Sequence, residues 1–133
     1  MVVRMRVGGE QFALPVEHVR EIARLGAISP VPGAGNVVLG VRNLRDQVLP
    51  VFDLAALLGV TADCPPSRII VVEQGGHRAG LAIDAVTDVA ALPDASDDAA
   101  SGFVSGTSLA DGEQVGVIDV PRLFAALQER AAA

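Results

Sequence analysis

The 133-residue sequence contains no Trp and no Tyr, and four Phe are its only aromatic residues, so side chains on which bases or sugars could stack are scarce. Lysine is also absent, and 16 acidic residues outnumber 10 arginines to give a formal net charge of −6. Proteins that bind nucleic acid through its phosphates normally carry the opposite excess. We therefore expect no nucleic-acid partner.

Cysteine occurs once, as Cys64, which excludes an internal disulfide and any multi-cysteine metal site. No stretch approaches the ~18 consecutive apolar residues of a membrane span. Near the N-terminus, Arg4 and Arg6 interrupt the valines, so the core of a signal peptide is missing. These absences predict a cytoplasmic protein without direct membrane insertion.

Half of the residues are hydrophobic and 20% are charged, which is enough to build one compact domain with a core of Val, Leu, Ile and Ala. Alternating apolar residues bounded by turn signals predict a mainly β chain. The expected elements are hairpins at 3–14, 36–52 (turn at Asp46 and Gln47), 68–92 and 103–118, a helical turn at 16–22 before a strand near 22–28, loops at 29–35, 60–67 and 93–102, and helices capped by Asp53 and Asp119.

The chain also matches itself. A shift of 67 positions pairs Gly8 with Gly75, Leu14 with Leu81, and Glu21 with Asp88, and a shift of 66 pairs Val51 with Val117 and Asp53 with Asp119. A unit of this size is marginal alone, because small domains bury only ~60% of their unfolded surface. We therefore predict two small five-stranded barrels that share an apolar seam, with a groove where they meet.

Signatures of catalysis are missing. His18 and His77 have no cysteine nearby, and the serine of GFVSG at 102–106 is one position out of place for a nucleophile elbow. We predict no catalytic residue, no metal site and no cofactor. The alternative from another class is a small-molecule or metal binder that uses Asp94, Asp97 and Asp98, although no distal Glu completes a calcium pattern.

One polar cluster lies in an otherwise apolar hairpin. Arg42, Asn43 and Arg45 follow each other within 36–59, and two accounts are open. In the first, Arg45 belongs to a solvated edge and pairs with a local acid such as Asp46. In the second, an arginine of the cluster reaches Glu21 and fixes a surface that faces a partner.

The ordered set of motifs resembles the CheW-like family of chemotaxis adaptors over nearly the whole chain. The motifs are VEHVREI, SPVPGAG, GVRNLR, VLPVFDL, IIVVE, GLAIDAVTDV and IDVPRLF. The resemblance implies a single CheW-like domain over 1–133, mainly β, of two intertwined five-stranded SH3-like barrels with short helices and a C-terminal helix. The implied first barrel covers approximately 12–66 with contacts from the C-terminal helix, and the second covers approximately 67–118 with contacts from the N-terminal strand.

The resemblance further implies a non-enzymatic adaptor, recruited to membrane receptor arrays, that couples the regulatory domain of a CheA-type histidine kinase to the cytoplasmic tip of methyl-accepting chemoreceptors. A gliding, twitching or developmental pathway is the alternative. The implied partner-binding residues are Arg45 and Glu21, with Val16, Val19, Leu39, Gly40, Val71 and Val72 in or near the groove and Arg42 and Asn43 in the same hairpin. The sequence departs from the family at Asp46, where Gly is usual after NLR, and in GFVSGTSLADGEQ, which is short and lacks an expected aromatic residue.

Overall fold

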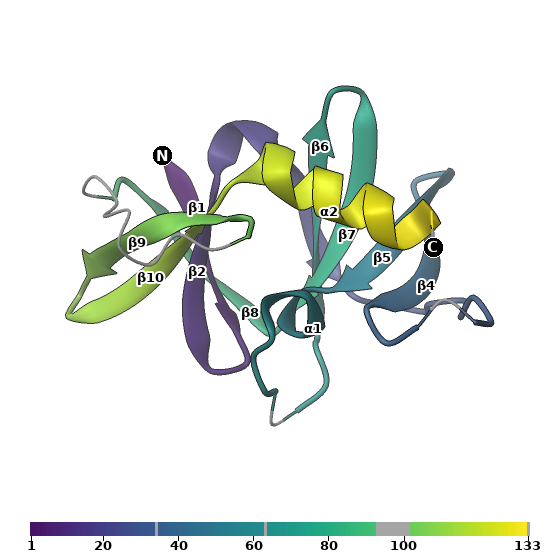
Figure 1. Ribbon diagram of the computed structural model, residues 1–133, viewed down its shortest axis with the longest axis horizontal. Coiled ribbons are helices and arrows are strands. Elements are labelled where there is room, and N and C mark those ends of the chain that lie inside the picture. Colours follow the sequence, from purple (N-terminus) through teal and green to yellow (C-terminus); the bar gives the residue numbers. More distant parts are fainter. Residues whose placement is uncertain (34, 63, 93–101, 133) are drawn as a thin grey trace.

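The computed structural model describes residues 1–33, 35–62, 64–92 and 102–132, which form ten strands and three short or medium helices (Figure 1). The strands are β1 (Val2–Val7), β2 (Glu10–Pro15), β3 (Val19–Arg24), β4 (Val38–Leu44), β5 (Gln47–Asp53), β6 (Arg68–Gln74), β7 (His77–Ile83), β8 (Ala85–Ala90), β9 (Val104–Ala110) and β10 (Glu113–Ile118). The helices are η1 (Val16–His18), a single 3₁₀ turn, α1 (Leu54–Leu58) and α2 (Val120–Ala132).

The strands form two five-stranded sheets. Sheet A has the order β8-β1-β2-β10-β9, and sheet B has the order β3-β6-β7-β5-β4. Most neighbours are antiparallel, but β2 pairs with β10 in parallel and β5 pairs with β7 in parallel. Each sheet therefore combines strands from both halves of the chain.

This sheet membership differs from the predicted barrel ranges, 12–66 and 67–118. Strands β6 and β7 follow residue 67 but belong to sheet B with β3, β4 and β5, and β2 belongs to sheet A. The reason is the parallel pairing, because β5 finds its parallel partner in β7 and β10 finds its own in β2. Parallel neighbours need a long crossover connection, so adjacency along the chain does not determine which sheet a strand joins.

The pairing registers follow the internal repeat. Val51 lies opposite Gly80 in sheet B, and the residues at the shifted positions, Val117 and Ala13, lie opposite each other in sheet A. Glu21 likewise lies opposite Val71, and Asp88 lies opposite Arg4. The two sheets are therefore equivalent structures, and a residue in one has a definable counterpart in the other.

Three local expectations need correction. The predicted helical turn over 16–22 is confined to η1, because the chain from Val19 onward is extended and pairs with β6. The run 78–92 breaks at Asp84, and its two parts, β7 and β8, lie in different sheets. The turn between β4 and β5 consists of Arg45 and Asp46, one position earlier than predicted.

Both predicted helix caps are confirmed. The carboxylate of Asp53 accepts a hydrogen bond from the backbone N–H of Ala55 at 3.1 Å, and that of Asp119 accepts one from Arg122 at 3.0 Å. Helix α1 ends after one and a half turns at Gly59, whose φ of 72° is left-handed. Helix α2 continues for 13 residues, and its predicted apolar stripe is buried: Val120, Leu123, Phe124 and Leu127.

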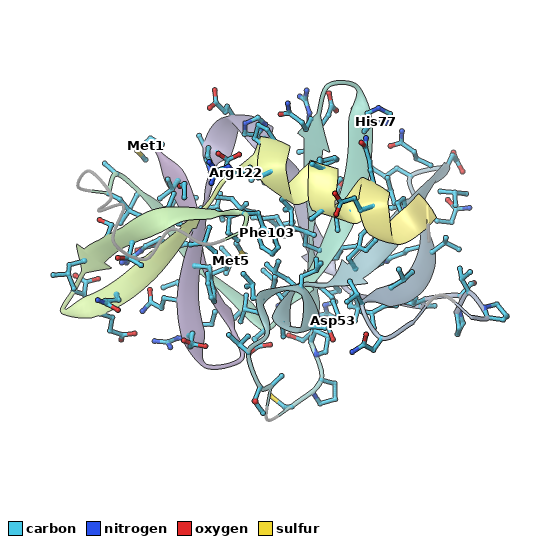
Figure 2. All side chains as sticks on the ribbon, viewed as in Figure 1. Met1, Met5, Asp53, His77, Phe103 and Arg122 are labelled. Carbon is cyan, nitrogen blue, oxygen red and sulfur yellow. The ribbon has the colours of Figure 1, made fainter. Side chains whose placement is uncertain are left out.

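The main core lies between the two sheets and under the helices. Met5 on β1, labelled in Figure 2, is completely buried there, together with apolar residues of both sheets, α1 and α2. A smaller cluster of Val51, Ile69 and Ala82 belongs to sheet B alone. These two clusters leave the edges of the sheets, and the turns that join their strands, available for contacts with other molecules.

The candidate cation ligands Asp94, Asp97 and Asp98, and all but the last residue of the predicted loop at 93–102, lie outside the described residues. Within the described part, no three His, Cys, Asp or Glu side chains come together as a metal site would require. The described helices are all too short or too polar to cross a membrane.

Candidate functional site

Arg45 and Glu21 meet at the surface of sheet B although 24 residues separate them in the chain. The Nε–H of Arg45 donates to both carboxylate oxygens of Glu21, at 3.0 and 3.1 Å. The arginine side chain is 78% exposed and the glutamate side chain 25% exposed. The contact of the second account is therefore present, with Arg45 as the arginine that reaches Glu21, and Asp46 is not its partner among the described residues.

The turn that carries Arg45 is conformationally strained. Arg45 and Asp46 have φ values of 52° and 63°, in the left-handed region that L side chains disfavour. Such φ values at both central residues match a type I′ hairpin turn, for which Asn-Gly or Asp-Gly is usual. The turn holds the guanidinium beside the edge strand β3 at a cost in stability.

This contact lies where sheet B closes on itself. Strands β3 and β4 are the two ends of the sheet, yet the backbone of Ser29, just after β3, pairs with that of Val41 on β4. The Nε–H of Arg42 donates to the carbonyl of Leu25 at 2.6 Å. The pair of Arg45 and Glu21 therefore lies beside the contacts that join the two edge strands, β3 and β4. These contacts hold the two side chains in fixed positions relative to each other.

Arg42 and Asn43 have different roles from Arg45 at the place where β4 approaches the chain after β3. Arg42 uses its guanidinium within the chain, since its Nη1 also donates to the carbonyl of Asn43 at 3.3 Å. Asn43 is exposed and lies opposite Val48 in the hairpin. Of these three polar residues, Arg45 and Asn43 have exposed side chains that a partner could contact. Arg42 instead links β4 to the chain after β3 through its hydrogen bond to Leu25.

The predicted valines fall into two groups. Val16 on η1 is exposed, and Val19 at the start of β3 is half-buried against the main core. Val71 and Val72 are buried inside sheet B, opposite Glu21 and Val19 respectively. The second pair is therefore buried on β6, the strand next to β3 in the same sheet, where the two side chains face opposite sides of the sheet.

Leu39 and Gly40 lie on β4. Leu39 is half-buried against the small cluster of sheet B, and Gly40 is buried at a bulge. The backbone of Ser29 comes too close to Gly40 for any side chain to fit there. Both residues therefore help β4 to pack against its neighbours and do not present side chains to a partner.

An ion-pair network next to this surface was missed by the sequence prediction. Glu73 on β6 binds Arg20 on β3 through two hydrogen bonds of 2.9 and 3.0 Å and Arg78 on β7 through one of 2.6 Å, and Arg78 also donates to Gln47. Hydrogen bonds from the two arginines hold the pKa of the Glu73 carboxyl below its usual value. The ion pair of Glu73 with Arg78 could have been predicted from the sequence, because the two residues lie opposite each other in the β6–β7 hairpin.

The residues Val16, Val19, Glu21, Ile22 and Arg45, which belong to η1, β3 and the β4–β5 turn, are here called the docking surface. Ile22 was not predicted, and its side chain is 42% exposed on β3. Val19 and Ile22 lie opposite Val72 and Ile70 of β6, whereas Glu21 lies opposite Val71, so the apolar side chains and the Glu21–Arg45 pair face different sides of the edge strand β3. Partly exposed apolar side chains can supply affinity in contact with another protein, and an oriented guanidinium can fix register.

Comparison with known proteins places the chain in a family. The model of the CheW-like domain matches residues 1–128. The chain belongs to the CheW-like family. The predicted family membership is thereby confirmed.

Named relatives cover almost all of the chain. A chemotaxis protein CheW of Rhizobium meliloti is 34% identical over 141 aligned residues, which are 98% of this chain and 91% of the relative. Protein FrzA of Myxococcus xanthus is 31% identical, over 96% of this chain and 87% of the relative. Protein PilI of Pseudomonas aeruginosa is 32% identical over 68% of this chain and 52% of the relative.

A solved structure supports the same conclusion. The crystal structure of the scaffolding protein TtCheW from Thermoanaerobacter tengcongensis superposes with a TM-score of 0.75 at 28% sequence identity, over 88% of this chain and 86% of that one. The predicted fold class, two five-stranded SH3-like barrels with few short helices, is confirmed.

Proposed function

We propose that this CheW-like adaptor couples a CheA-type histidine kinase to the cytoplasmic tips of chemoreceptors and that it works without catalysis. The proposal draws on the family membership and on the ordered docking surface. As a cytoplasmic protein recruited to membrane receptor arrays, it needs a rigid frame that presents binding surfaces.

The observation that carries the proposal is the hydrogen-bonded pair of Arg45 and Glu21. Glu21 accepts both hydrogen bonds from Nε, which leaves the Nη groups of a mostly exposed arginine available to a partner. An exposed pair of this kind adds little to folding stability. Its value is in binding, because a guanidinium held in one orientation loses less entropy when a partner docks.

We expect a partner helix to lay its apolar side against Val16, Val19 and Ile22 while a carboxylate or carbonyl accepts from Arg45. Helix-in-groove binding of this kind needs partly exposed apolar side chains on a rigid wall, and η1 and β3 supply them. Val71 and Val72, which are buried on the neighbouring strand β6, would contribute only by holding β3 in place.

The proposal is tested by Arg45→Ala in the full-length chain. We expect the variant to keep its circular dichroism spectrum and melting temperature, because the side chain is exposed, and to capture the CheA-type kinase or a receptor cytoplasmic fragment of the source organism about tenfold less well. The matched control is Arg122→Ala, which removes an exposed arginine from α2. Unchanged capture by Arg45→Ala would remove this residue from the binding surface.

A second setting for the same function is a chemosensory pathway that does not control flagella. FrzA and PilI are related to this chain at 31% and 32% identity. Identification of the receptors that co-purify with the native protein distinguishes the two settings.

A further inference from the structure

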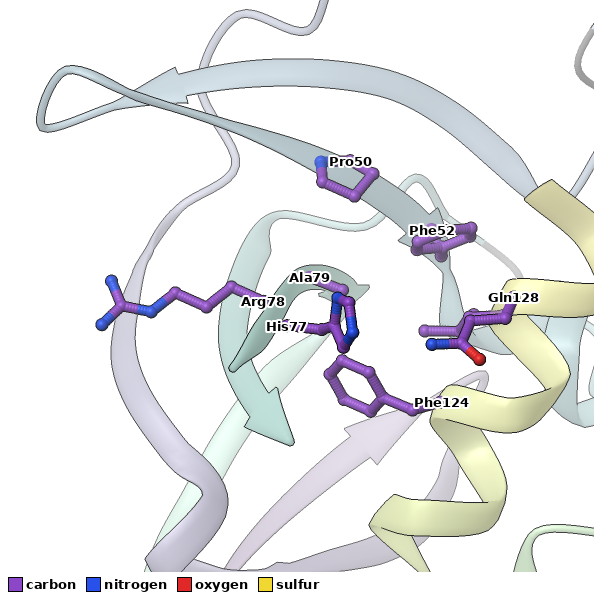
Figure 3. Close-up of a pocket in the computed structure, with 8 residues that line it drawn as sticks. Pro50, Phe52, His77, Arg78, Ala79, Phe124 and Gln128 are labelled. Atoms are coloured by element: carbon purple, nitrogen blue, oxygen red, sulfur yellow. The ribbon is translucent and has the colours of Figure 1, made fainter. Parts of the chain in front are cut away.

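The two equivalent sheets differ in how much of each is covered by a helix. Helix α2 follows β10 of sheet A and its second half lies over β5 and β7 of sheet B. Figure 3 shows Phe124 and Gln128 of α2 facing Pro50, Phe52 and His77 of these strands. The space left there is a small notch of about 140 Å³.

Helix α1 is the counterpart of α2 by the shift of 66, since it follows β5 as α2 follows β10. It ends at Leu58, the position equivalent to Phe124, and Gly59 then turns the chain away. No described residue therefore corresponds to Leu127 and Gln128 as a helical cover for sheet A.

A larger hollow of about 450 Å³ lies there, where no described helix covers sheet A, and we call it the open seat. It is lined by residues of β2, β9 and β10, among them Glu10, Phe12, Thr107, Glu113, Gln114 and Gly116. Glu10, Phe12 and Gly116 are the counterparts of His77, Ala79 and Pro50, which lie under α2. The open seat in sheet A is thus equivalent to the place that α2 occupies in sheet B.

The lining of the open seat mixes polar and apolar residues, and Phe12 and Val104 supply its apolar part. The ring of Phe12 lies against Gly116, where a Cβ atom would come within 2.8 Å of the ring. Because Gly116 has no side chain, the ring of Phe12 can lie directly against the backbone of β10. Leu or Phe side chains of a helix could pack on this apolar part, as Phe124 and Leu127 pack in sheet B.

The charged residues around the open seat indicate what kind of partner would bind there. His77 and Arg78 border the notch under α2, whereas their counterparts at the open seat are Glu10 and Gln11, and Glu113 adds a second carboxylate. Glu113 binds Gln11 at 2.8 Å and lies 3.6 Å from Arg6, while Glu10 is exposed and forms no ion pair among the described residues. The rim is therefore net acidic and favours a basic partner.

From the equivalence with the place of α2, the lack of a helical cover among the described residues, the apolar part of the lining and the acidic rim, we infer that the open seat binds an amphipathic helix of a partner protein, with apolar residues spaced like Phe124 and Leu127 and with flanking Lys or Arg. This site is separate from the docking surface, which lies on β3 and the β4–β5 turn of the other sheet. The inference does not depend on which pathway the adaptor serves.

The test uses two synthetic 14-residue helical peptides that carry the apolar pattern of α2, one with lysines at the flanking positions and one with glutamates. Each is titrated into the ¹⁵N-labelled full-length chain. We expect the lysine peptide to shift the amide signals of Phe12, Thr107 and Gln114 and the glutamate peptide to bind at least about tenfold more weakly. The variants Gln114→Trp, which fills the seat, and Glu10→Lys, which reverses its charge, should each weaken the lysine peptide by a similar factor.

Glu17→Lys is the matched control, because Glu17 is exposed on η1 and lies outside the open seat. No shift at the open seat, equal binding of both peptides, or shifts confined to the docking surface would overturn the inference. Concentration-dependent shifts of the same residues without peptide would show a second copy of this chain to be the occupant and would equally overturn it. None of these outcomes bears on Arg45→Ala, so the two proposals fail independently.

Discussion

The same three positions in the two sheets hold two different charge arrangements. In sheet B, Glu21 pairs with the turn residue Arg45, and Val71 lies between their strands as an apolar support. The counterparts in sheet A are Asp88, Asp111 and Arg4. There the buried Arg4 donates two hydrogen bonds of 2.6 Å to Asp88 and one of 3.2 Å to Asp111.

Exposure decides what each arrangement does. The side chain of Arg45 is 78% exposed and that of Arg4 is 8% exposed. Arg4 is therefore a structural cation that joins β1, β8 and the β9–β10 turn, and the hydrogen bonds with Asp88 raise the pKa of Arg4 and lower the pKa of Asp88. Sheet A thus uses a buried arginine at this position, whereas sheet B presents its arginine to solvent, so of Arg4 and Arg45 it is Arg45 whose guanidinium is available for recognition.

The largest expected effect is on stability, from Asp88→Ala compared with Glu21→Ala. Loss of Asp88 leaves a buried guanidinium with only the exposed Asp111, and we expect the melting temperature to fall by about 10 °C. Loss of Glu21 should lower it by less than about 2 °C, because Arg45 remains solvated. Thermal unfolding followed by circular dichroism measures both. Equal falls in melting temperature would mean that the Arg4–Asp88 and Arg45–Glu21 pairs do not differ in the way described.

The paired change Arg4→Val with Asp88→Ala sharpens that result. It copies the apolar support of sheet B, where Val71 stands at the position of Arg4. Since removal of both members of a buried pair is often close to neutral, we expect the double variant to recover most of the melting temperature lost by Asp88→Ala. A double variant no more stable than Asp88→Ala would show that Arg4 contributes more through packing than through charge.

A smaller effect is expected from acid. The pKa values of Asp88 and Glu73 are lowered by their arginines, so each group binds fewer protons when folded than when unfolded near pH 4. Their contribution is complete above an unfolded pKa of about 4 and is lost as pH falls through the lower folded pKa. Urea unfolding at pH 3 to 7 should show stability falling below pH 4, and the fall should be shallower in Arg4→Val with Asp88→Ala. The same slope in both proteins would contradict this assignment.

The smallest expected effect concerns the two hairpin turns. Asp111 and Gly112 form the turn in sheet A with the usual Asp-Gly dipeptide, whereas Arg45 and Asp46 form its counterpart with two non-glycine residues at positive φ. Asp46→Gly should therefore stabilise the chain by about 1 kcal/mol in urea unfolding. Asp84→Gly, at a position outside both turns, is the control and should give no such gain. A loss of stability in Asp46→Gly would show that the Asp46 side chain makes a favourable contact.

Local signals predicted the hairpins, the caps Asp53 and Asp119 and the apolar stripe of α2, because turn dipeptides and periodicity act over a few residues. Sheet membership was not predictable in this way, since the parallel pairs β2 with β10 and β5 with β7 join strands far apart in the chain. The extended start of β3 was mistaken for helix because Val16, Val19 and Ile22 have helical spacing, yet pairing with β6 decides the conformation.

The contact of Glu21 with Arg45 was one of two accounts that the sequence left open, and the motif resemblance pointed to it. The burial of Val71 and Val72, the structural use of Arg42 and the network around Glu73 required the three-dimensional register. Each depends on which face of a strand turns inward, and a strand bulge such as that between Val19 and Glu21 shifts this alternation.

The central claim is that Glu21 and Arg45 act together as one recognition element, and a charge-swap cycle tests it most directly. Capture of the CheA-type kinase by purified full-length protein is measured for Glu21→Arg, Arg45→Glu and the double variant. The account predicts that each single change weakens capture by about tenfold or more and that the double variant recovers part of the loss, because the pair re-forms in reverse. Losses that simply add in the double variant would contradict it.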